Sequence, residues 1–328
     1  MKSGRVLITG GSGFLGSALV KKMLVEGWHV RVLDDNSRGA ARRLVDVAAD
    51  IEFIEGDVCD YDSVHRACRG VDVIAHLAYI NGTAFFYSKP GRVLEVGMKG
   101  ALHTLDAARA HGIERYWLMS SSEVYQHPKQ VPTDEGAPLV VPDVMNPRYS
   151  YGGGKIASEL LAIHYDKGLS QVVIVRPHNV YGADMGFEHV VPQMIMRAAR
   201  VAEATPEGET LKFPIRGDGR HKRAFVYIDD FVEGCYLAFS KGQGRSLYHV
   251  GTGDEITVAA LADKVLGLFG RKGVVVPSAA PQGETPRRCP DITKVVALGY
   301  KPQVSLDDGL ARTHAWYMDN QNLWLPKT

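Results

Sequence analysis

Tyr151 and Lys155 are four residues apart in a stretch whose apolar residues recur with helical periodicity. Residues with this spacing lie on one face of a helix, so the Lys155 ammonium can lie near the Tyr151 phenol. A nearby positive charge lowers the pKa of a tyrosine from about 10 toward neutrality, which would make Tyr151 a general base. The same spacing arises by chance on solvated helix faces, so its meaning depends on the surrounding elements.

A cluster of hydroxyl side chains, Ser120, Ser121 and Ser122, follows a short apolar run and is followed in turn by Glu123. The run is typical of a buried strand, and open α/β sheets bind ligands at the carboxyl ends of their strands. A hydroxyl at that edge can hold a sugar oxygen, with one carboxylate beside it. Serines are also common in helix caps and turns, which is the structural alternative.

A glycine-rich turn over residues 9–16 lies between a short apolar run and a helical pattern. Its glycines Gly10, Gly13 and Gly16 allow a sharp turn, a close approach to a ligand, and close packing of the helix on the strand. The amide groups at the helix start then face an anion. This arrangement predicts a site for the pyrophosphate of a dinucleotide cofactor.

Asp34, at the end of the next predicted strand (29–34), supports this prediction. In dinucleotide sites a carboxylate at this place accepts hydrogen bonds from the ribose hydroxyls of adenosine. Because a carboxylate repels a ribose phosphate, the sequence predicts NAD in preference to NADP. Arg31, Arg38 and Arg42 lie nearby in the sequence and weaken that preference.

Three glycines, Gly152, Gly153 and Gly154, separate Tyr151 from Lys155. Inside a helix each glycine costs roughly 1 kcal/mol relative to alanine. The cost indicates that another group approaches the helix backbone closely at this point. A bound cofactor and a helix of a second copy of the chain would both explain such an approach.

Strand and helix patterns alternate through the first half of the chain at the pace of βαβ units. This alternation predicts an α/β fold with a doubly wound parallel sheet of the Rossmann type. After Pro177 the pattern becomes irregular, which predicts a smaller, loop-rich α/β lobe that binds the substrate. We expect a cofactor domain over 1–177, to which 224–250 returns, and a mainly substrate-binding lobe over 178–328. The expected strands include 51–54, 71–76, 116–120 and 171–176, and the expected helices are 63–69, 92–111, 151–167, 188–203, 229–240, 257–269, 291–298 and 306–319.

The composition is that of a protein expected to stay in the cytoplasm. A formal net charge of +1 over 328 residues gives no signature of nucleic-acid binding. The four cysteines are far apart, which disfavours a disulfide framework or a zinc site, and the spacing of His178, His189 and His221 is not that of metal ligands. No apolar run approaches the length of a membrane span, so we expect neither a metal nor membrane attachment.

Taken together, these residues resemble the extended short-chain dehydrogenase/reductase family, and within it the nucleotide-sugar epimerases and dehydratases. The resemblance extends over nearly the whole chain, and so many motifs in the same order are more specific than any one of them. The matching segments are 9–16, 34–37, 56–58, 76–78, 120–125, 151–155, 176–182, 217–219, 223–230, 248–253 and 288–292.

The resemblance implies a role for each matching position. Ser121 takes the place of the catalytic serine or threonine, Tyr151 that of the general base, and Lys155 that of the lysine that keeps the tyrosine acidic. Glu123 stands where some members carry a further catalytic carboxylate. The residues implied to bind NAD are Gly10, Gly13, Phe14, Leu15, Gly16, Asp34, Asn36, Asp57, Val58, Leu77, Ala78, Tyr151 and Lys155, with His76 lining the same cleft. Those implied to bind a nucleotide-diphosphate sugar are Ser122, Asn179, Arg223 and Arg288.

The chain departs from the family pattern at four positions. Gly97 stands where the family usually has asparagine, and Gln126 where glycine is common. Gly154 replaces a frequent serine before the lysine, and Ala224 replaces an aspartate after an arginine. None of these departures removes a catalytic candidate, and they indicate a subfamily whose substrate the resemblance leaves open.

The function implied by this resemblance is that of an NAD-dependent nucleotide-sugar epimerase, acting at C4 through a transient 4-keto sugar. A nucleotide-glucuronate decarboxylase and a nucleotide-sugar 4,6-dehydratase stay open as alternatives, because Glu123 has counterparts in both. Ser122 stands where many dehydratases carry an aspartate, so the dehydratase pair is only half present. Glu123 as a turn cap, Asn179 as a turn cap, and Arg223 and Arg288 as surface cations are the structural alternatives.

Two further classes are disfavoured. A redox sensor or scaffold that had lost its chemistry should also have lost Tyr151 or Lys155, and both are present. A simple alcohol dehydrogenase or ketoreductase would not need the diphosphate-type residues of the second half. Members of the resembled family commonly form homodimers through the helices that correspond to 92–111 and 151–167, so the expected protein partner is a second copy of the chain.

Overall fold

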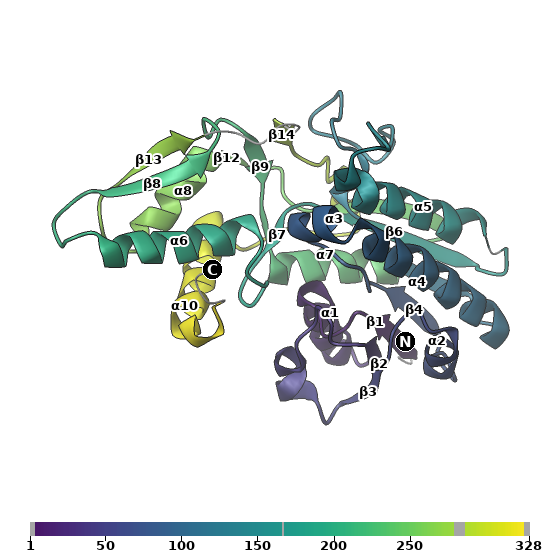
Figure 1. The fold of residues 1–328 in the computed structure, drawn as a ribbon. Coiled ribbons are helices and arrows are strands. Elements are labelled where there is room, and N and C mark those ends of the chain that lie inside the picture. Colours follow the sequence, from purple (N-terminus) through teal and green to yellow (C-terminus); the bar gives the residue numbers. More distant parts are fainter. Residues whose placement is uncertain (1–3, 166, 279–285, 325–328) are drawn as a thin grey trace.

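The computed structural model describes residues 4–165, 167–278 and 286–324, and its central feature is a seven-stranded sheet (Figure 1). The strand order is β11-β6-β5-β4-β1-β2-β3, and every neighbouring pair is parallel. The chain builds one half outward from β1 and then returns to build the other from β4, which confirms the doubly wound Rossmann fold. The strands are β1 (Arg5–Thr9), β2 (His29–Asp34), β3 (Ile51–Glu55), β4 (Val73–His76), β5 (Arg115–Met119), β6 (Gln171–Pro177) and β11 (Arg245–Val250).

Both faces of the inner strands of this sheet are buried, because successive residues along each of them enter different cores. In β1, Val6 and Ile8 belong to one apolar cluster and Leu7 to the other, and β6 repeats the pattern at Val173 and Ile174. Continuous apolar runs are typical of parallel strands that helices cover on both sides. Residues of α1 (Phe14–Val25) and α7 (Ile228–Lys241) complete the first cluster, and those of α2 (Tyr61–Ala67), α4 (Pro90–His111) and α5 (Ser150–His164) complete the second.

Local signals set the ends of the helices that carry the site. Pro90 lies in the first turn of α4, where its missing N–H has no helical partner to lose, and Gly112 follows the helix with a φ of 65°. Asp60 caps α2 by accepting hydrogen bonds from two backbone amides. The expected helices are confirmed to within a few residues, whereas α3 (Thr83–Ser88) and the 3-10 helices η1 (Ala41–Val47), η2 (Ser122–Val124), η3 (Pro147–Tyr149) and η4 (Gln321–Leu323) were not expected.

A second lobe lies beside the large sheet and contains α6 (Val190–Ala204), α8 (Val258–Gly267) and α10 (Leu306–Asp319) (Figure 1). Three small sheets, which the irregular sequence pattern did not predict, accompany them. They join β7 (Val180–Tyr181) to β10 (Val226–Tyr227), β9 (Lys222–Ala224) to β12 (Glu255–Thr257) and β14 (Arg287–Arg288), and β8 (Leu211–Arg216) to β13 (Gly273–Ser278).

The chain returns to the large sheet after entering the second lobe. Strand β11, within the segment 224–250, pairs with β6, and the short helix α9 (Thr293–Val296) packs near it. The division into two domains at residue 177 stays a prediction. The predicted domains and the predicted helix 151–167 include residues 1–3, 166, 279–285 and 325–328, which lie outside the described residues.

Candidate active site

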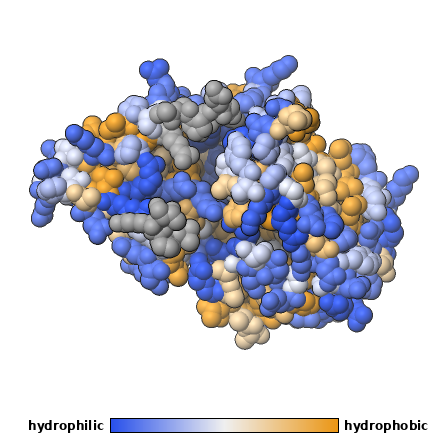
Figure 2. All heavy atoms as spheres, in the orientation of Figure 1, coloured by the Kyte–Doolittle hydropathy of each residue, from blue (hydrophilic) through white to orange (hydrophobic). Residues whose placement is uncertain are grey.

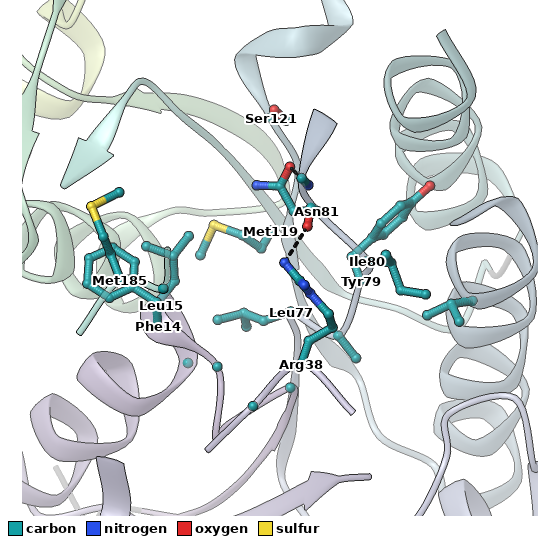
Figure 3. A pocket seen from close by; sticks show the side chains of 18 of the residues that line it. Phe14, Leu15, Arg38, Leu77, Tyr79, Ile80, Asn81, Met119, Ser121 and Met185 are labelled. Carbon is teal, nitrogen blue, oxygen red and sulfur yellow. Dashed lines mark hydrogen bonds between the residues drawn. The ribbon is translucent and has the colours of Figure 1, made fainter. Parts of the chain in front are cut away.

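Most of the predicted site residues line one pocket of about 680 Å³, at the point where the strand order reverses between β1 and β4. Figure 3 shows Phe14 and Leu15, from the start of α1, on one side and Tyr79 and Ile80, from the loop after β4, on the other. Doubly wound sheets bind ligands at such a switch point. The predicted residues in its lining are Gly10, Gly13, Phe14, Leu15, Gly16, Asp34, Asp57, Val58, Leu77, Ala78, Ser121, Ser122, Glu123, Tyr151, Lys155, Asn179 and Arg288.

The glycine turn after β1 fits the pyrophosphate of a dinucleotide. Gly10 has a φ of 73°, and a Cβ atom at this position would lie 2.7 Å from the backbone nitrogen of Ala78. At Gly16 a Cβ atom would overlap the Gly10 carbonyl oxygen and lie 2.8 Å from Gly11 Cα. Helix α1 begins directly after Gly13, which has no side chain to cap its first amides. The backbone therefore forms a bare cradle at a helix start, which suits the phosphates of NAD.

Thr9, at the end of β1, holds the wall behind this turn. Its Oγ1 lies 2.8 Å from Nδ1 of His76 and accepts hydrogen bonds from the amides of Leu77 and Ala78. Burial lowers the pKa of His76 to about 3, so the imidazole is neutral. His76, expected to line the cofactor cleft, is not part of this pocket lining; its ring bonds to the Thr9 hydroxyl and so joins the ends of β1 and β4.

Asp34 ends β2 and lines the pocket as predicted, and backbone amides hold its carboxylate in place. It accepts hydrogen bonds from the amides of Ser12 and Asn36, both at 2.9 Å. Asn36 itself, predicted to contact the cofactor, is not part of this pocket lining. Its φ of 55° shows why asparagine stands there, since this residue type tolerates the left-handed backbone of the turn after β2.

We expect NAD to bind more tightly than NADP, and Asp34→Ala to narrow the difference. The carboxylate repels a ribose phosphate, whereas Arg38 and Arg42, which also line the pocket, attract one. Removing the carboxylate should shift the ratio of the two dissociation constants toward NADP by about tenfold. Titration of both cofactors against both proteins measures this ratio, with Asp35→Ala as the neighbouring-charge control. Equal affinity of the unaltered protein for NAD and NADP would contradict the assignment.

Three arginines of the pocket lining connect the segment after β2 to the segment after β7. The Arg38 guanidinium donates to the Asn81 carbonyl oxygen at 2.9 Å, the contact drawn as a dashed line in Figure 3, and pairs with Glu188 at 3.0 Å. Arg42 and Arg43 both pair with Asp184. We call this set the arginine strap: Arg38, Arg42 and Arg43.

Tyr151 lies in the first turn of α5, with its ring buried among aromatic neighbours. Phe86 stacks on it with ring centroids 4.9 Å apart, and Tyr79 meets it edge-on at 5.1 Å. Burial raises the pKa of Tyr151, and a hydrogen bond with Ser121 opposes this shift. The expected lowering of this pKa is wrong for this structure, because burial of the phenol is the largest influence on the pKa and raises it.

Lys155 is buried one helical turn after Tyr151. Its Nζ donates to the Met119 carbonyl oxygen at 2.7 Å and lies 4.0 Å from the ring centroid of Tyr79, against 5.8 Å for Tyr151. Burial lowers the pKa of Lys155 to about 7, although Glu159 acts in the opposite direction. A carbonyl oxygen and an aromatic face are thus the direct contacts of the Lys155 ammonium, and Glu159 favours its charged form from further along the helix.

The glycines of α5 make room for groups of the same chain. A Cβ atom at Gly152 would lie 2.6 Å from Nε2 of Gln126 and 2.9 Å from the Glu123 carbonyl oxygen. One at Gly154 would overlap the Tyr79 hydroxyl oxygen. The close approach inferred from the sequence is confirmed, but the groups that approach come from the loops after β4 and β5.

Glu123 and Arg288 form an ion pair in the pocket wall, with Nη1 of Arg288 2.6 Å from Oε1 of Glu123. Burial alone would raise the pKa of Glu123, but Arg288 overrides this, with smaller contributions from Arg148 and Arg223, and holds the pKa below its usual range. Arg148 was not identified from the sequence, since it precedes α5 outside every motif. The arrangement keeps a carboxylate ionised among three guanidinium groups.

The other predicted substrate residues differ in their placement. Asn179 lines the pocket, but its Nδ2 also donates to the Ala224 carbonyl oxygen at 2.8 Å, so it has the local structural role that the sequence left open. Arg223 is not part of the pocket lining, and its Nη1 donates to the Lys222 carbonyl oxygen at 2.8 Å. Its strand β9 pairs with β14 so that Arg223 lies directly beside Arg288.

Ser121 combines the two roles considered for the serine cluster. It accepts a hydrogen bond from the Glu123 amide at 3.1 Å and so caps η2, and it also bonds to Tyr151. Ser122 is buried and lines the pocket. The capping function and a contact with the reacting group are thus compatible at one residue.

A buried polar network supports the helix that carries Tyr151 and Lys155. Ser120 donates to Glu159 of α5, and Glu159 forms an ion pair with Arg176 at 2.5 Å. The Arg176 and Glu159 side chains are only 3% and 4% exposed, and Arg176 also bonds to the Tyr125 hydroxyl. Glu159 was not predicted from the sequence, because nothing in its local pattern marks it as the partner of an arginine 17 residues away.

Within residues 4–165, 167–278 and 286–324, no group of three histidine, cysteine, aspartate or glutamate residues is arranged to hold a metal ion. None of the helices in those ranges is long and apolar enough to cross a membrane. His178 is buried beside His249, with ring centroids 4.8 Å apart, and burial holds the pKa of His178 well below its usual value.

Known proteins similar to this chain catalyse several related reactions. A UDP-glucose 4-epimerase of Mycolicibacterium smegmatis is 32% identical over 318 residues, covering 94% of this chain and 97% of its own length. A UDP-N-acetyl-alpha-D-glucosaminuronate decarboxylase of Bacillus cytotoxicus is 30% identical over 328 residues, covering 97% and 99%. The crystal structure of DesIV, a dTDP-glucose 4,6-dehydratase of Streptomyces venezuelae solved with NAD bound, has a TM-score of 0.86 at 32% identity, covering 98% and 99%.

A family model identifies what these relatives have in common. The model of the "NAD dependent epimerase/dehydratase family" matches residues 6–251, a range that includes the glycine turn, Asp34, Ser121, Tyr151 and Lys155. The pocket geometry agrees with it, because the bare phosphate cradle and the tyrosine–lysine pair line the same cavity. The chain therefore belongs to the NAD dependent epimerase/dehydratase family, a group of NAD-using enzymes among the extended short-chain dehydrogenases/reductases.

Proposed function

We propose that this enzyme is an NAD-dependent nucleotide-sugar 4-epimerase that acts through a transient 4-keto sugar. The observation that carries the proposal is the 2.6 Å ion pair between Glu123 and Arg288. A 4,6-dehydratase needs a base for the C5 proton and an acid for the departing C6 hydroxyl. Glu123 is held ionised, and the neighbouring Ser122 has no proton acidic enough for that second task. Epimerisation requires neither group.

In this proposal the pocket residues divide the proton transfer and the binding. Tyr151 takes the proton of the C4 hydroxyl, Ser121 steadies the reacting oxygen, and Lys155 stabilises the phenolate and binds the nicotinamide ribose. The pocket would hold NAD, which would supply the acceptor and donor of the C4 hydride. Arg288 holds the diphosphate while the keto sugar rotates to present its opposite face. The substrate is neither oxidised nor reduced overall.

A nucleotide-sugar decarboxylase is the second candidate, and one feature of the same ion pair favours it. The Arg288 guanidinium lies in the pocket wall, and guanidinium groups bind carboxylates through two parallel hydrogen bonds. A sugar carboxylate could compete with Glu123 for this partner. Two carboxylates would then lie close together, and their repulsion is the reason that we rank the uncharged substrate of an epimerase first.

The mass and stereochemistry of the product separate the candidates. We expect a panel of nucleotide sugars differing in base and hexose, incubated with the NAD-loaded enzyme, to yield a product isobaric with its substrate. NMR of this product should show inversion at C4. Loss of water would establish a dehydratase and loss of carbon dioxide a decarboxylase, and either result overturns the proposal.

Glu123→Gln is expected to keep kcat within about tenfold of the unaltered enzyme, because epimerisation assigns no proton to this residue. Glutamine preserves the shape of the side chain and an oxygen that can accept from Arg288. Steady-state turnover of the isobaric product measures the effect, with Ser122→Ala as the neighbouring control. A loss of a hundredfold or more at Glu123 alone would assign it a proton-transfer role and contradict the plain epimerase.

We also propose a homodimer formed through α4 and α5. Figure 2 shows apolar residues on the surface over these helices, and Leu94 and Leu160 are 40% and 55% exposed. Apolar surface shared by neighbouring helices is typical of protein interfaces. Light scattering at micromolar concentration should give twice the mass of the chain, and Leu160→Lys should reduce it to the monomer. Val25→Lys, at an exposed residue at the end of α1, is the control, and a monomer mass for the unaltered protein would refute the dimer.

A further inference from the structure

Tyr79, in the loop after β4, occupies a notch between α4 and α5 that two glycines create. A Cβ atom at Gly97 of α4 would overlap the Tyr79 hydroxyl oxygen and lie 2.6 Å from its Cε2 atom. One at Gly154 of α5 would overlap the same oxygen. In Figure 3 the Tyr79 ring projects from its loop toward the neighbouring helices. Two departures from the family pattern, at positions 97 and 154, thus make space for one side chain.

The ring of Tyr79 contacts both members of the proton-transfer pair. The Lys155 Nζ lies 4.0 Å from the centroid of its face, and its plane meets the Tyr151 ring at 84° with centroids 5.1 Å apart. Its hydroxyl is buried and, within the described chain, has no hydrogen-bond partner. Buried hydroxyls normally have such a partner. The contacts that Tyr79 makes with the proton-transfer pair are therefore those of its ring and not of its hydroxyl.

We propose that Tyr79 is a positioning residue for the reaction: its ring face holds the Lys155 ammonium and its edge orients Tyr151. A cation over an aromatic face is stabilised most where water is excluded, as it is here. Apart from this ring, the hydrogen bond that fixes Nζ is the one to the Met119 carbonyl oxygen. The inference rests on the catalytic roles proposed above for Lys155 and Tyr151.

The notch offers a test in which one methyl group displaces the ring. Gly154→Ala places that methyl against the Tyr79 hydroxyl, so the ring must shift from the position in which it contacts Lys155 and Tyr151. We expect kcat to fall by roughly tenfold to a hundredfold, with KM for the sugar nucleotide within about threefold, because displaced reacting groups slow the chemical step more than binding. In Tyr79→Phe/Gly154→Ala the nearest ring atom, Cζ, lies at an ordinary contact distance of 3.5 Å, so kcat should return to that of Tyr79→Phe.

Gly97→Ala provides the matched control, since it adds the same methyl group on the other side of the same ring. There the added carbon also overlaps the ring carbons, with Cε2 at 2.6 Å, so removal of the hydroxyl cannot relieve the clash. Tyr79→Phe should therefore rescue Gly154→Ala but not Gly97→Ala. A general loss of helix stability would not distinguish the two sites, because both glycines lie within helices.

NAD binding supplies a readout that does not depend on turnover, because Lys155 is proposed to bind the nicotinamide ribose. NAD titration should show weaker binding in Gly154→Ala and recovery in the double variant. If Tyr151→Phe retains turnover, or no nucleotide sugar is converted, while NAD affinity follows this pattern, the proposed reaction fails and the positioning of Lys155 stands. Full kcat and NAD affinity in Gly154→Ala, or a failure of Tyr79→Phe to rescue it, would overturn the inference. If the single variant Gly154→Ala does not fold, the double variant is the test: recovery of folding and kcat supports the inference, and no recovery overturns it.

Discussion

Replacement of Tyr151 by phenylalanine is expected to lower kcat by about a hundredfold or more. The substitution removes the hydroxyl that exchanges a proton with the sugar, and it keeps the ring that stacks on Phe86 and meets Tyr79 edge-on. The packing of α5 and the NAD pocket should therefore persist. Steady-state turnover of the converted nucleotide sugar measures the loss, and NAD titration shows whether the cofactor still binds.

The control for this prediction is Ser121→Ala, which should reduce kcat less than Tyr151→Phe does. Ser121 bonds to Tyr151 and caps η2, but it is not the group that takes the proton. The order of the two effects therefore separates proton transfer from support of the reacting oxygen. Near-normal turnover in Tyr151→Phe, with NAD bound, would remove Tyr151 from the proposed mechanism.

Glu159→Ala is expected to destabilise the protein by about 3–5 kcal/mol, because it leaves Arg176 buried without its carboxylate. Glu159 accepts from Nε of Arg176 at 2.8 Å and also bonds to Ser120, so a single substitution removes several contacts of a side chain that is 4% exposed. The free energy of unfolding in urea measures the loss. Since Glu159 is on the same helix as Lys155 and Tyr151, NAD affinity should fall with it.

Lys264→Ala is the matched control, because its ion pair with Asp307 has a similar length but lies at the surface. The two side chains are 40% and 70% exposed, and water replaces the contact when one partner is removed. Its effect on the unfolding free energy should be a small fraction of that of Glu159→Ala. A similar, small effect at both sites would mean that the buried pair does not support α5.

The Rossmann half of the molecule was predictable because its signals are local. Short, mainly apolar strand patterns, glycine turns and helical periods follow one another along the chain, and each predicted strand lies in the observed sheet. The strands of the second lobe gave no such signal. β8 and β13 pair across more than fifty residues, and in β13 the apolar residues Val274 and Val276 are exposed, so no buried run marks the strand.

The pocket lining was predictable wherever a motif fixed the residue, as at Gly10, Asp34 and Tyr151. What the sequence could not provide was the environment of those residues. The direction of the Tyr151 pKa shift depends on how deeply the ring is buried, and the contacts of Lys155 depend on where Tyr79 folds. Both are properties of packing between segments that are far apart in the chain.

The departures from the family pattern also depend on packing between segments that are far apart in the chain. Gly97 and Gly154 seemed to be independent losses of a polar side chain, whereas the structure relates both to Tyr79. Gln126 and Gly152 form a second such pair, in which the larger residue of one segment lies against the bare backbone of the other. A substitution in one segment is thus matched by space in another, and such matching is visible only after folding.

The arginine strap has a consequence for the lifetime of the bound cofactor. Its ion pairs with Asp184 and Glu188 tie the segment after β2 to the segment after β7. Because both segments line the pocket, we expect these contacts to restrict the exit of a bound dinucleotide. An enzyme that returns a hydride to the sugar that supplied it has no need to exchange its dinucleotide between cycles. We therefore expect NAD to stay bound over many catalytic cycles and to leave only when the ion pairs of the strap open.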